Sequence, residues 1–490
     1  MGKVSRPILT GIYPRKRLFA LLDRKRERPV IWVSGPPGCG KTTLVSSYLE
    51  ARRLPCLWYQ LEAGDADPAT FFYFLGQAVQ KASPRKRKPL PLLTPEYLQG
   101  IPTFTLRYFQ SLYDRLRIPG ILVFDNYQDV PAGAAWHEIL LTGLSSLPEG
   151  MNAVLISRSD PPPALIRLQA NHLMEILGWK DLQLTLDESE GMVRLRAKNK
   201  LSRKAIRRMH REMDGWAAGL VLGMESERIE DRQPESVGKL VPEKVFDYFA
   251  SEIFDRTDEE VQRFLLRTAF FPKMTAPMAE GLTGQPSASR ILSTLSRNHY
   301  FTEKRFPAAP IYQYHPLFRE FLISRAKETF SPALLSSLFR RAAVFLEEDG
   351  QEEASVSLFR EAGDWEGMIR LILKNAPSMV EQGRTRSLEE WLNGLPRGLF
   401  ENHPWLLYWM GACRQPFDPA FARPFFEKAF ERFRNQSDAA GTFMAWSGIV
   451  SSILSAFENY KSLDRWISVL ETLLRDFRKF PSEEVGAMVT

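Results

Sequence analysis

A glycine-rich loop near the N-terminus constrains this chain more than any other feature. The segment VSGPPGCGKTT at residues 33–43 matches G-x-x-x-x-G-K-[ST], a pattern in which backbone amides surround phosphate oxygens. An apolar run at residues 29–33 suits a buried parallel strand, and residues 43–49 suit a helix. Because strand, loop and helix follow in this order, the sequence predicts a nucleotide-binding P-loop rather than a chance glycine turn.

Each residue type in the loop has an expected role. Glycines lack side chains, so backbone N–H groups can close around phosphate oxygens, and the positive end of the following helix faces the same oxygens. Lys41 is expected to reach the β- and γ-phosphates, and the Thr42 hydroxyl to hold Mg²⁺. The predicted nucleotide-binding residues of the loop are Gly35, Pro36, Pro37, Gly38, Cys39, Gly40, Lys41, Thr42 and Thr43.

A second nucleotide motif is the segment ILVFDN at residues 121–126, in which an apolar strand ends in the acid Asp125. Asp125 is expected to hold Mg²⁺ through water. Many hydrolysing relatives carry a further acid at the next position, where this chain has Asn126. Asp129 is the candidate substitute for that base, although its spacing does not place it at the γ-phosphate. The sequence therefore predicts binding of ATP or ADP with Mg²⁺, and at most a slow ATPase.

A third strand, residues 153–156, leads to Arg158 at the carboxyl edge of the predicted sheet, where ligands of open α/β sheets bind. Two interpretations stay open here: a cation that senses the γ-phosphate, or an arginine paired with Asp160 or another loop carboxylate. Further strands are expected at residues 56–61 and 172–177. The sequence thus predicts an α/β P-loop domain of five strands separated by helices.

Length and composition indicate a multidomain globular protein. At 490 residues the chain is too long for one core, and about three or four domains are expected. No apolar run approaches the length of a membrane span, and the three cysteines form no CxxC pair. We therefore expect a cytoplasmic protein without membrane contact. The net charge of +7 permits nucleic-acid contact without demonstrating it.

Seven short segments, in chain order, carry a resemblance to a known family: RP at 6–7, DNYQ at 125–128, SRSDP at 157–161, DGWAAGL at 214–220, VFDYF at 245–249, FLLRT at 264–268 and YQYHPLF at 312–318. Together they resemble the STAND class of signalling ATPases. The subgroup is the one typified by the bacterial maltose-regulon activator and the large ATP-binding regulators of the LuxR type. The resemblance covers roughly residues 6–375.

The resemblance implies a domain order and a sheet. The expected parts are an N-terminal arm at 1–28, a P-loop domain at 29–178, a helical domain at 179–240, a winged-helix domain at 241–325 and a helical region at 326–490. The implied sheet is parallel, with strand order 5-1-4-3-2, so that the strand bearing Arg158 lies between those of Lys41 and Asp125. Adjacent motif strands would instead indicate a kinase-like protein.

The resemblance also implies two further site residues. In the family, a histidine of the winged-helix domain reaches the nucleotide phosphates and locks a closed, ADP-bound state, and His315 matches it. Without the resemblance, a histidine before Pro316 would be interpreted as a helix cap or a core residue. The segment around Arg6 packs near the base in the family, which makes Arg6 a nucleotide-binding candidate.

The region 326–490 contains aromatic residues that recur at a fixed spacing. Trp405 and Trp446 are 41 residues apart, and so are Phe425 and Trp466. Helix pairs at this period predict a TPR-like solenoid, with irregular helical packing as the alternative. The partner expected there is an inducer or a protein. No polar cap follows the second unit, so we expect the repeats to continue beyond the chain end, and DNA to be contacted only through a domain that is not visible here.

These observations favour a switch over other uses of a P-loop. The predicted function is an ATP/ADP-binding signalling switch of a bacterial transcriptional regulator, whose nucleotide state controls domain opening and self-association. The alternatives are a kinase-like phosphotransferase, a helical-repeat scaffold with a regulatory nucleotide site, and a ring-forming motor. A kinase needs a second substrate pocket with a base and cationic clamps, and no such cluster follows the loop. The inducing signal, target genes and oligomer size cannot be deduced from the sequence.

Overall fold

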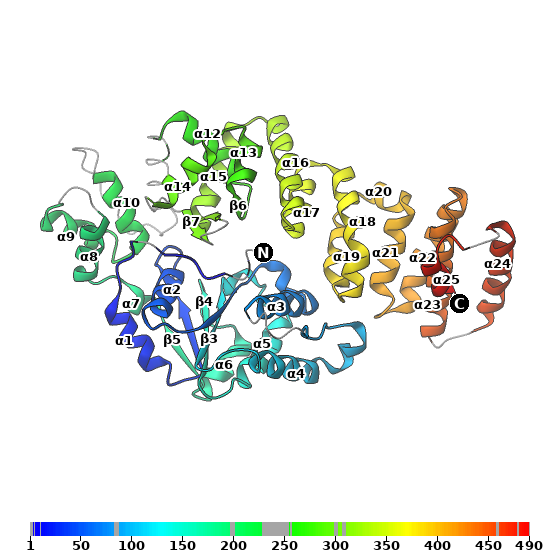
Figure 1. Cartoon of the computed structure of the whole chain (residues 1–490), viewed down its shortest axis with the longest axis horizontal. Coiled ribbons are helices and arrows are strands. Elements are labelled where there is room, and N and C mark those ends of the chain that lie inside the picture. Colours follow the sequence, from blue (N-terminus) through cyan, green and yellow to red (C-terminus); the bar gives the residue numbers. More distant parts are fainter. Residues whose placement is uncertain are drawn as a thin grey trace. The chain divides into compact units, whose positions relative to one another are not determined.

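The computed structural model describes residues 3, 5–9, 11–82, 88–196, 201–227, 254, 257–297, 302–305, 310–456, 460–477 and 480–489. Contacts divide the chain into two compact units (Figure 1). The first comprises Met1–Pro68, Phe74–Pro91 and Gly100–Ser355, and the second comprises Ala69–Tyr73, Leu92–Gln99 and Val356–Thr490. Among the described residues, none of the helices is both long and apolar enough to cross a bilayer.

A five-stranded parallel sheet forms the core of the first unit. Its strands are β1 (Val30–Ser34), β2 (Cys56–Gln60), β3 (Gly120–Asp125), β4 (Met151–Ser157) and β5 (Met174–Leu177). The spatial order is β2-β3-β4-β1-β5, with every pair parallel. The predicted order 5-1-4-3-2 is therefore confirmed. Because β4 separates the two motif strands β1 and β3, the kinase-like arrangement loses its support.

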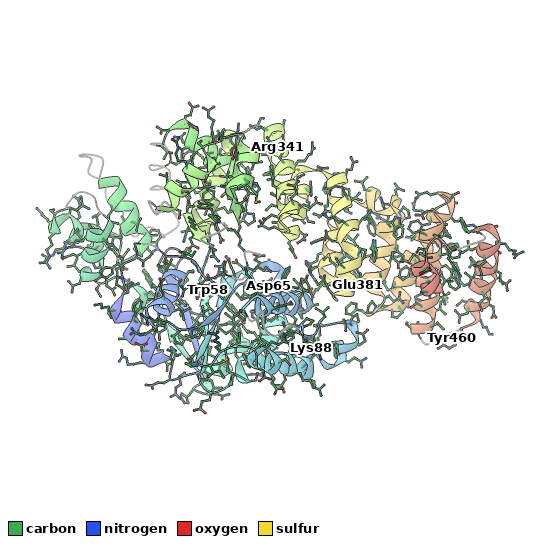
Figure 2. All side chains as sticks on the ribbon, viewed as in Figure 1. Trp58, Asp65, Lys88, Arg341, Glu381 and Tyr460 are labelled. Atoms are coloured by element: carbon green, nitrogen blue, oxygen red, sulfur yellow. The ribbon has the colours of Figure 1, made fainter. Side chains whose placement is uncertain are left out.

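Helix α1 (Lys16–Lys25) precedes the first strand, and further helices connect the strands, as parallel crossovers require. The connecting helices are α2 (Lys41–Ala51), α3 (Pro68–Ala82), α4 (Ile101–Tyr113), α5 (Trp136–Ser145) and α6 (Pro163–Ala170), with the short turns η2 (Ala63–Ala66), η3 (Pro95–Gly100) and η4 (Tyr127–Asp129). Strands β1, β3 and β4 are buried along their whole length, which explains their continuous apolar sequences. Trp58 of β2, labelled in Figure 2, is 2% exposed and belongs to this core.

Two further groups of elements follow the sheet within the first unit. Four helices come first: α7 (Trp179–Leu182), α8 (Leu186–Arg196), α9 (Arg203–Glu212) and α10 (Ala217–Glu227). The second group contains α12 (Glu259–Thr268), β6 (Met274–Thr275), α13 (Ala276–Thr283), α14 (Ala288–Arg297), β7 (Thr302–Arg305), β8 (Ile311–Tyr314), α15 (Pro316–Thr329) and α16 (Pro332–Glu348).

The second group contains the strands and helices expected of a winged helix. Its three strands form an antiparallel sheet in the order β6-β8-β7, and helices α12 to α15 accompany them. A hydroxyl pair 2.7 Å apart, Thr268 Oγ1 and Tyr314 Oη, joins α12 to β8 inside the core. The motif VFDYF at 245–249 lies outside the described residues. The domain boundaries given above stay predictions.

The second unit is helical in its described part. From α17 (Glu352–Ala362), which spans the division between the units, the chain continues through α18 (Trp365–Glu381), α19 (Thr385–Asn393), α20 (Arg397–Asn402), α21 (Pro404–Arg414), α22 (Pro419–Asn435), α23 (Ala439–Ser455), α24 (Lys461–Phe477) and α25 (Glu483–Val489). Asp418 and Asp438 cap α22 and α23, since their carboxylates accept backbone N–H groups at 2.9 Å.

The predicted helix pairs appear in this unit. Trp405 and Trp446 lie on α21 and α23, and Phe425 and Trp466 lie on the following helices α22 and α24. Trp446 and Trp466 are buried in one core, and the Trp446 indole donates a 2.8 Å hydrogen bond to the Trp466 carbonyl. The recurring aromatic residues therefore reflect repeated packing of helix pairs around a shared core, as the period of 41 residues predicts.

Candidate nucleotide-binding site

The P-loop lies between β1 and α2, as the motif requires. Gly38 and Gly40 have φ angles of +73° and +86°, a region that favours glycine because other residues carry a Cβ. Gly40 is the N-cap of α2, so the helix begins at Lys41 and directs its N-terminal amides at the loop. This geometry is suited to binding an anion.

Lys41 folds back over its own loop. Its Nζ donates to the carbonyls of Gly35 at 2.7 Å and Pro36 at 3.0 Å, and lies 3.7 Å from Cys39 Sγ. The side chain is almost fully buried, and this burial lowers the pKa of Lys41. A phosphate would give this buried cation a partner of opposite charge, which the loop carbonyls supply only as dipoles.

Thr42 and Asp125 form the expected pair of metal ligands. The Thr42 hydroxyl donates a 3.1 Å hydrogen bond to Asp125 Oδ1, which also accepts the Asn126 N–H at 3.0 Å. Burial raises the pKa of Asp125 to about 6, although nearby Arg305 opposes that rise. Two oxygens of the kind that Mg²⁺ prefers therefore lie within one hydrogen bond of each other, so these residues fit the ion.

A polar cavity of about 690 Å³ opens beside the loop. Its walls include Lys41 and Asp125 from the sheet domain and Arg305 from β7 of the winged helix. Three buried polar atoms among its lining residues have no hydrogen-bond partner in the described part of the chain: Gln60 Oε1, Arg305 Nε and Gln313 Oε1. Buried polar atoms are normally paired, so this cavity fits a polar, hydrogen-bonding ligand and its water.

A more apolar cavity of about 880 Å³ adjoins the polar one. The two share Gly38, Gly40, Thr43 and His315 in their walls. The apolar wall is formed mainly by Ile12, Tyr13, Leu44, Leu184, Met192 and Val221. A nucleotide has one apolar and one charged end, and the pair of cavities matches this division.

His315 lies where the cavities meet. It is the N-cap residue of α15, but its side chain makes no capping hydrogen bond, so helix capping does not explain it. Burial, together with the Arg158 and Lys41 cations, lowers the pKa of His315 to about 4. The imidazole is therefore neutral near pH 7, with one nitrogen able to donate and the other to accept.

Arg158 lines the polar cavity directly after β4. Its ion pair is with Glu320 of α15, at 4.0 Å, rather than with Asp160 as one interpretation suggested. The Arg158 backbone N–H donates to Gln128 Oε1 at 3.1 Å. The guanidinium thus stands at the cavity with Glu320 and Asp129 as nearby carboxylates, and a role at the phosphates stays a prediction.

Asp129 and Arg6 line neither cavity. Asp129 is exposed, and its carboxylate accepts a hydrogen bond from Gln128 Nε2 at 3.0 Å. Arg6 lies 3.9 Å from Glu50 near the end of α2. Asp129 was a candidate base and Arg6 a candidate implied by the family resemblance, and both roles stay predictions without support from this geometry.

Trp216, for which sequence analysis predicted no role, contacts the loop directly. Its indole Nε1 donates to the Pro37 carbonyl at 2.8 Å, and the Ala218 N–H donates to the Gly38 carbonyl at 3.0 Å. The helical group after the sheet therefore docks on the P-loop itself. The DGWAAGL segment was the available signal, since a tryptophan among small residues at a helix start suits close packing on a backbone.

Arg305 and Gln60 were also missed. Both line the polar cavity, yet they come from β7 and β2, far apart in the chain. Arg305 is 2% exposed, and it donates to the Ser5 carbonyl at 2.8 Å and to Glu303 at 3.2 Å. A buried arginine beside a Walker-type aspartate has no signature in sequence, because only the fold brings β7 to this edge of the sheet.

The fold and the loop define a P-loop nucleotide-binding protein, and comparison with known proteins refines this class. Residues 24–157 match the AAA domain family, and residues 250–335 match the MalT winged helix domain. An AAA domain of this kind implies nucleotide binding.

Curated relatives agree with the family matches. The HTH-type transcriptional regulator MalT of Serratia proteamaculans is 27% identical over 401 residues, which cover 81% of this chain and 44% of the relative. MalT of Klebsiella pneumoniae is 25% identical over 408 residues, covering 82% of this chain and 45% of the relative. The chain thus spans less than half the length of these relatives.

A solved structure supports the fold. The STAND protein with a tetratricopeptide repeat sensor from Pyrococcus horikoshii superimposes with a TM-score of 0.60 at 16% identity, covering 99% of this chain and 74% of that one. The predicted resemblance is therefore confirmed: this chain is similar to STAND-class P-loop ATPases, and to the MalT regulators in particular.

Proposed function

We propose that this chain is the nucleotide-operated switch of a transcriptional regulator. ADP stabilises a closed arrangement of the P-loop and winged-helix parts, and ATP with Mg²⁺ favours an open arrangement that self-associates. The observation that carries the proposal is the shared wall of the cavity: Lys41 and Asp125 come from one part, and Arg305 and His315 from the other. A ligand bound there contacts both parts, so it can shift the balance between their arrangements.

Each residue has a task in this proposal. The loop amides and Lys41 hold the phosphates, and Thr42 with Asp125 would hold Mg²⁺, which screens the phosphate charge. Neutral His315 donates a hydrogen bond to the phosphates and so ties the winged helix to the ligand. Asn126 and the exposed Asp129 offer no positioned base for water, which suits slow turnover and a long-lived signalling state.

The regulatory output is proposed from the relatives. Their names describe HTH-type transcriptional regulators, of which this chain matches less than half. We propose that the helical second unit receives an inducer or a protein, and that DNA contact is made by a part of the protein outside this sequence.

Nucleotide binding and shape test this function together. The protein should retain ADP through purification, and exchange of ADP for a non-hydrolysable ATP analogue with Mg²⁺ should increase the radius of gyration or the oligomer mass. Mass spectrometry of the released nucleotide and light scattering make the two measurements. An empty site that turns ATP over rapidly, with no change of shape, would show an ordinary enzyme instead.

Lys41→Ala is the control for this experiment. It removes the buried cation of the loop, so we expect no detectable ATP or ADP binding by calorimetry while the circular dichroism spectrum stays unchanged. A variant that binds at the wild-type affinity would refute the assignment of the phosphate site.

A further inference from the structure

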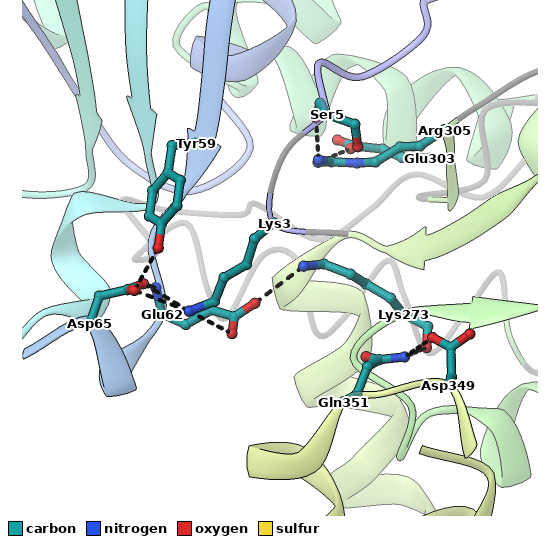
Figure 3. Close-up of polar contacts among 10 residues, drawn as sticks. All are labelled: Lys3, Ser5, Tyr59, Glu62, Asp65, Lys273, Glu303, Arg305, Asp349 and Gln351. Atoms are coloured by element: carbon teal, nitrogen blue, oxygen red, sulfur yellow. Dashed lines mark hydrogen bonds and ion pairs between the residues drawn. The ribbon is translucent and has the colours of Figure 1, made fainter. Parts of the chain in front are cut away.

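We propose that a partly buried ion-pair cluster of Lys3, Glu62, Asp65 and Lys273, which we call the Glu62 latch, holds the winged helix closed on the P-loop domain and must break for the switch to open. The proposal rests on the proposed function and adds to it the contact that sets the closed state. Figure 3 shows the cluster.

The acidic half of the latch belongs to the P-loop domain. Glu62 and Asp65 follow β2, and Asp65 lies in the short turn η2. Asp65 is fully buried; it accepts the Tyr59 hydroxyl at 2.8 Å and the Glu62 N–H at 2.8 Å. These bonds fix the two carboxylates next to each other, where their like charges require cations.

The two cations come from other parts of the chain. Lys3, in the N-terminal segment, lies 3.1 Å from both Asp65 oxygens and 3.4 Å from Glu62 Oε2. Lys273, directly before β6 of the winged helix, lies 3.2 Å from Glu62 Oε1 and is 6% exposed. The Lys273 carbonyl accepts a 3.3 Å hydrogen bond from Gln351. Each acid of the latch thus has a cation beside it, and Lys273 is the member that crosses to the winged helix.

Such a cluster specifies an arrangement more than it stabilises a fold. Desolvation offsets much of the attraction in a buried ion pair, whereas removal of one partner leaves an uncompensated buried charge. Burial would raise the pKa of Glu62, but Lys3 and Lys273 hold it at about 2, so Glu62 is ionised at any physiological pH. The latch therefore opens only when Lys273 moves away, and not by protonation.

The N-terminal segment also contacts both the winged helix and the P-loop domain outside the latch. Arg305 of β7 donates to the Ser5 carbonyl at 2.8 Å, and Ile8 forms an antiparallel bridge with Lys304. On the other side, the Ser46 hydroxyl of α2 donates to the Pro7 carbonyl at 3.0 Å. Residues 5–9 thus run between the P-loop helix and the winged-helix strand, and Lys3 lies just before them in the chain.

The latch is also close in the chain to the nucleotide cavity. Gln60, two residues before Glu62, lines the polar cavity and pairs in register with Asp125. The Leu61 N–H donates to the Asp125 carbonyl at 2.8 Å. Any shift of Asp125 on binding Mg²⁺ with ATP would therefore move the backbone that carries Glu62. This connection gives the nucleotide a route to the latch.

The test replaces Lys273 by methionine, which keeps the aliphatic stem and removes the charge. In ADP-loaded protein, Lys273→Met should increase the radius of gyration and accelerate release of a fluorescent ADP analogue by about tenfold, because the closed state alone loses its ion pair. Glu62→Gln should act in the same direction. The double variant should release ADP no faster than the more affected single variant, since both remove one shared interaction.

Lys25→Met is the matched control. Lys25 lies 3.0 Å from Glu175, and this pair has a partly exposed glutamate like that of the latch, but its residues lie on α1 and β5, outside the winged helix. Its ADP release and radius should equal those of the wild type. Lys273→Arg, which keeps the charge, should also behave as the wild type and shows that the site tolerates substitution.

Three results would overturn the latch. Equal effects of Lys273→Met and Lys25→Met would show a general loss of stability, and a folded Lys273→Met with wild-type release and radius would show a structural lysine. If the wild type itself binds nucleotide without changing shape, the proposed function fails and the latch with it. The second result refutes the latch alone when the wild type does change shape on binding nucleotide.

Discussion

Burial and two neighbouring cations determine the protonation state of His315. It borders both cavities and has Lys41 and Arg158 as nearby cations, so a proton on the imidazole would meet two positive charges. Without ligand the imidazole is therefore neutral near pH 7, and one of its nitrogens can donate a hydrogen bond to a phosphate. Two predictions follow from this placement, one about the ligand and one about pH.

Removing the imidazole should weaken the closed, ADP-bound state. A single hydrogen bond to a charged group contributes about 1.5–3 kcal/mol, or roughly ten- to a hundredfold in affinity. We expect His315→Ala to release ADP faster and to have a larger hydrodynamic radius, and to lose less affinity for ATP than for ADP. Stopped-flow fluorescence and size-exclusion chromatography measure these effects. Unchanged release and radius would make His315 a structural residue.

The low pKa of His315 also predicts a pH dependence of stability. The folded state keeps His315 neutral down to about pH 4, whereas the unfolded chain takes up the proton at the ordinary value of 6.5. The contribution of His315 to stability should therefore fall as the pH drops from about 6.5 to about 4, because this residue binds more protons in the unfolded state in that window, whereas Asp125, with its raised pKa, acts in the opposite direction. At about 1.4 kcal/mol per unit, the loss attributable to His315 is at most about 3.5 kcal/mol.

The variant His315→Gln isolates this effect. Gln carries no titrating proton, so its unfolding free energy should fall less between pH 6.5 and pH 4.5 than that of the wild type. Urea unfolding at each pH, without nucleotide, makes the comparison. Parallel curves for the two proteins would mean that His315 already titrates normally in the folded state.

At the residue scale, sequence identified the parts that a motif records and missed those that only the fold creates. Lys41, Thr42 and Asp125 were predicted because their chemistry is tied to a local pattern of strand, loop and helix. Trp216 and Arg305 contact or border the same site from segments 179 or more residues distant from the loop. Their side chains acquire a role through domain placement, which a single sequence does not encode locally.

Elements meet at the P-loop more closely than its motif suggests. A Cβ at Gly38 would lie 2.6 Å from the Ala218 Cβ and 3.2 Å from the Trp216 ring. The loop backbone therefore fits against the start of α10, whose N–H groups and indole hold it by the two hydrogen bonds to Pro37 and Gly38. The glycine serves packing between elements as well as the approach of phosphate.

Gly38→Ala should accordingly separate the helical group from the loop. The added methyl is too close to Ala218, and φ near +73° is strained for alanine, at a cost of about 1–2 kcal/mol before any clash. We expect a lower unfolding temperature, weaker ADP binding and faster hydrogen exchange in residues 216–220.

Gly133→Ala provides the matched control, since a Cβ there meets no atom within 4 Å and the residue lines neither cavity. It should bind ADP as the wild type does. Equal exchange rates in residues 216–220 for the two variants would show that Gly38 does not hold the helical group.

At the element scale, topology was the most predictable feature. Strand order followed from the family resemblance, and the solenoid helices followed from the spacing of Trp405 and Trp446. Neither source indicated that residues 5–9 would bridge α2 and β7, because this segment has no periodicity and its position depends on partners such as Ser46 and Arg305.

The whole molecule consists of two compact units with separate cores, and only the first contains the candidate site. Every residue that lines the two cavities lies in that unit. A ligand stabilises the unit that binds it according to its concentration relative to its dissociation constant, by about 2.7 kcal/mol at a hundredfold excess. The second unit gains nothing from the nucleotide by this direct route.

Calorimetry should therefore resolve two unfolding transitions, of which ADP shifts one. Stabilisation by about 2.7 kcal/mol corresponds to several degrees for a unit of this size, and Lys41→Ala should abolish the shift. The shifted transition is assigned to the first unit by protease protection of peptides around Trp32 and Asp125. The other transition should stay within error of its position without ligand, because the helical repeats bury Trp446 and Trp466 in a core that contains no cavity residue. If ADP raised both transition temperatures equally, the unfolding of the two units would be coupled. The nucleotide would then stabilise the solenoid core as strongly as the loop that binds it.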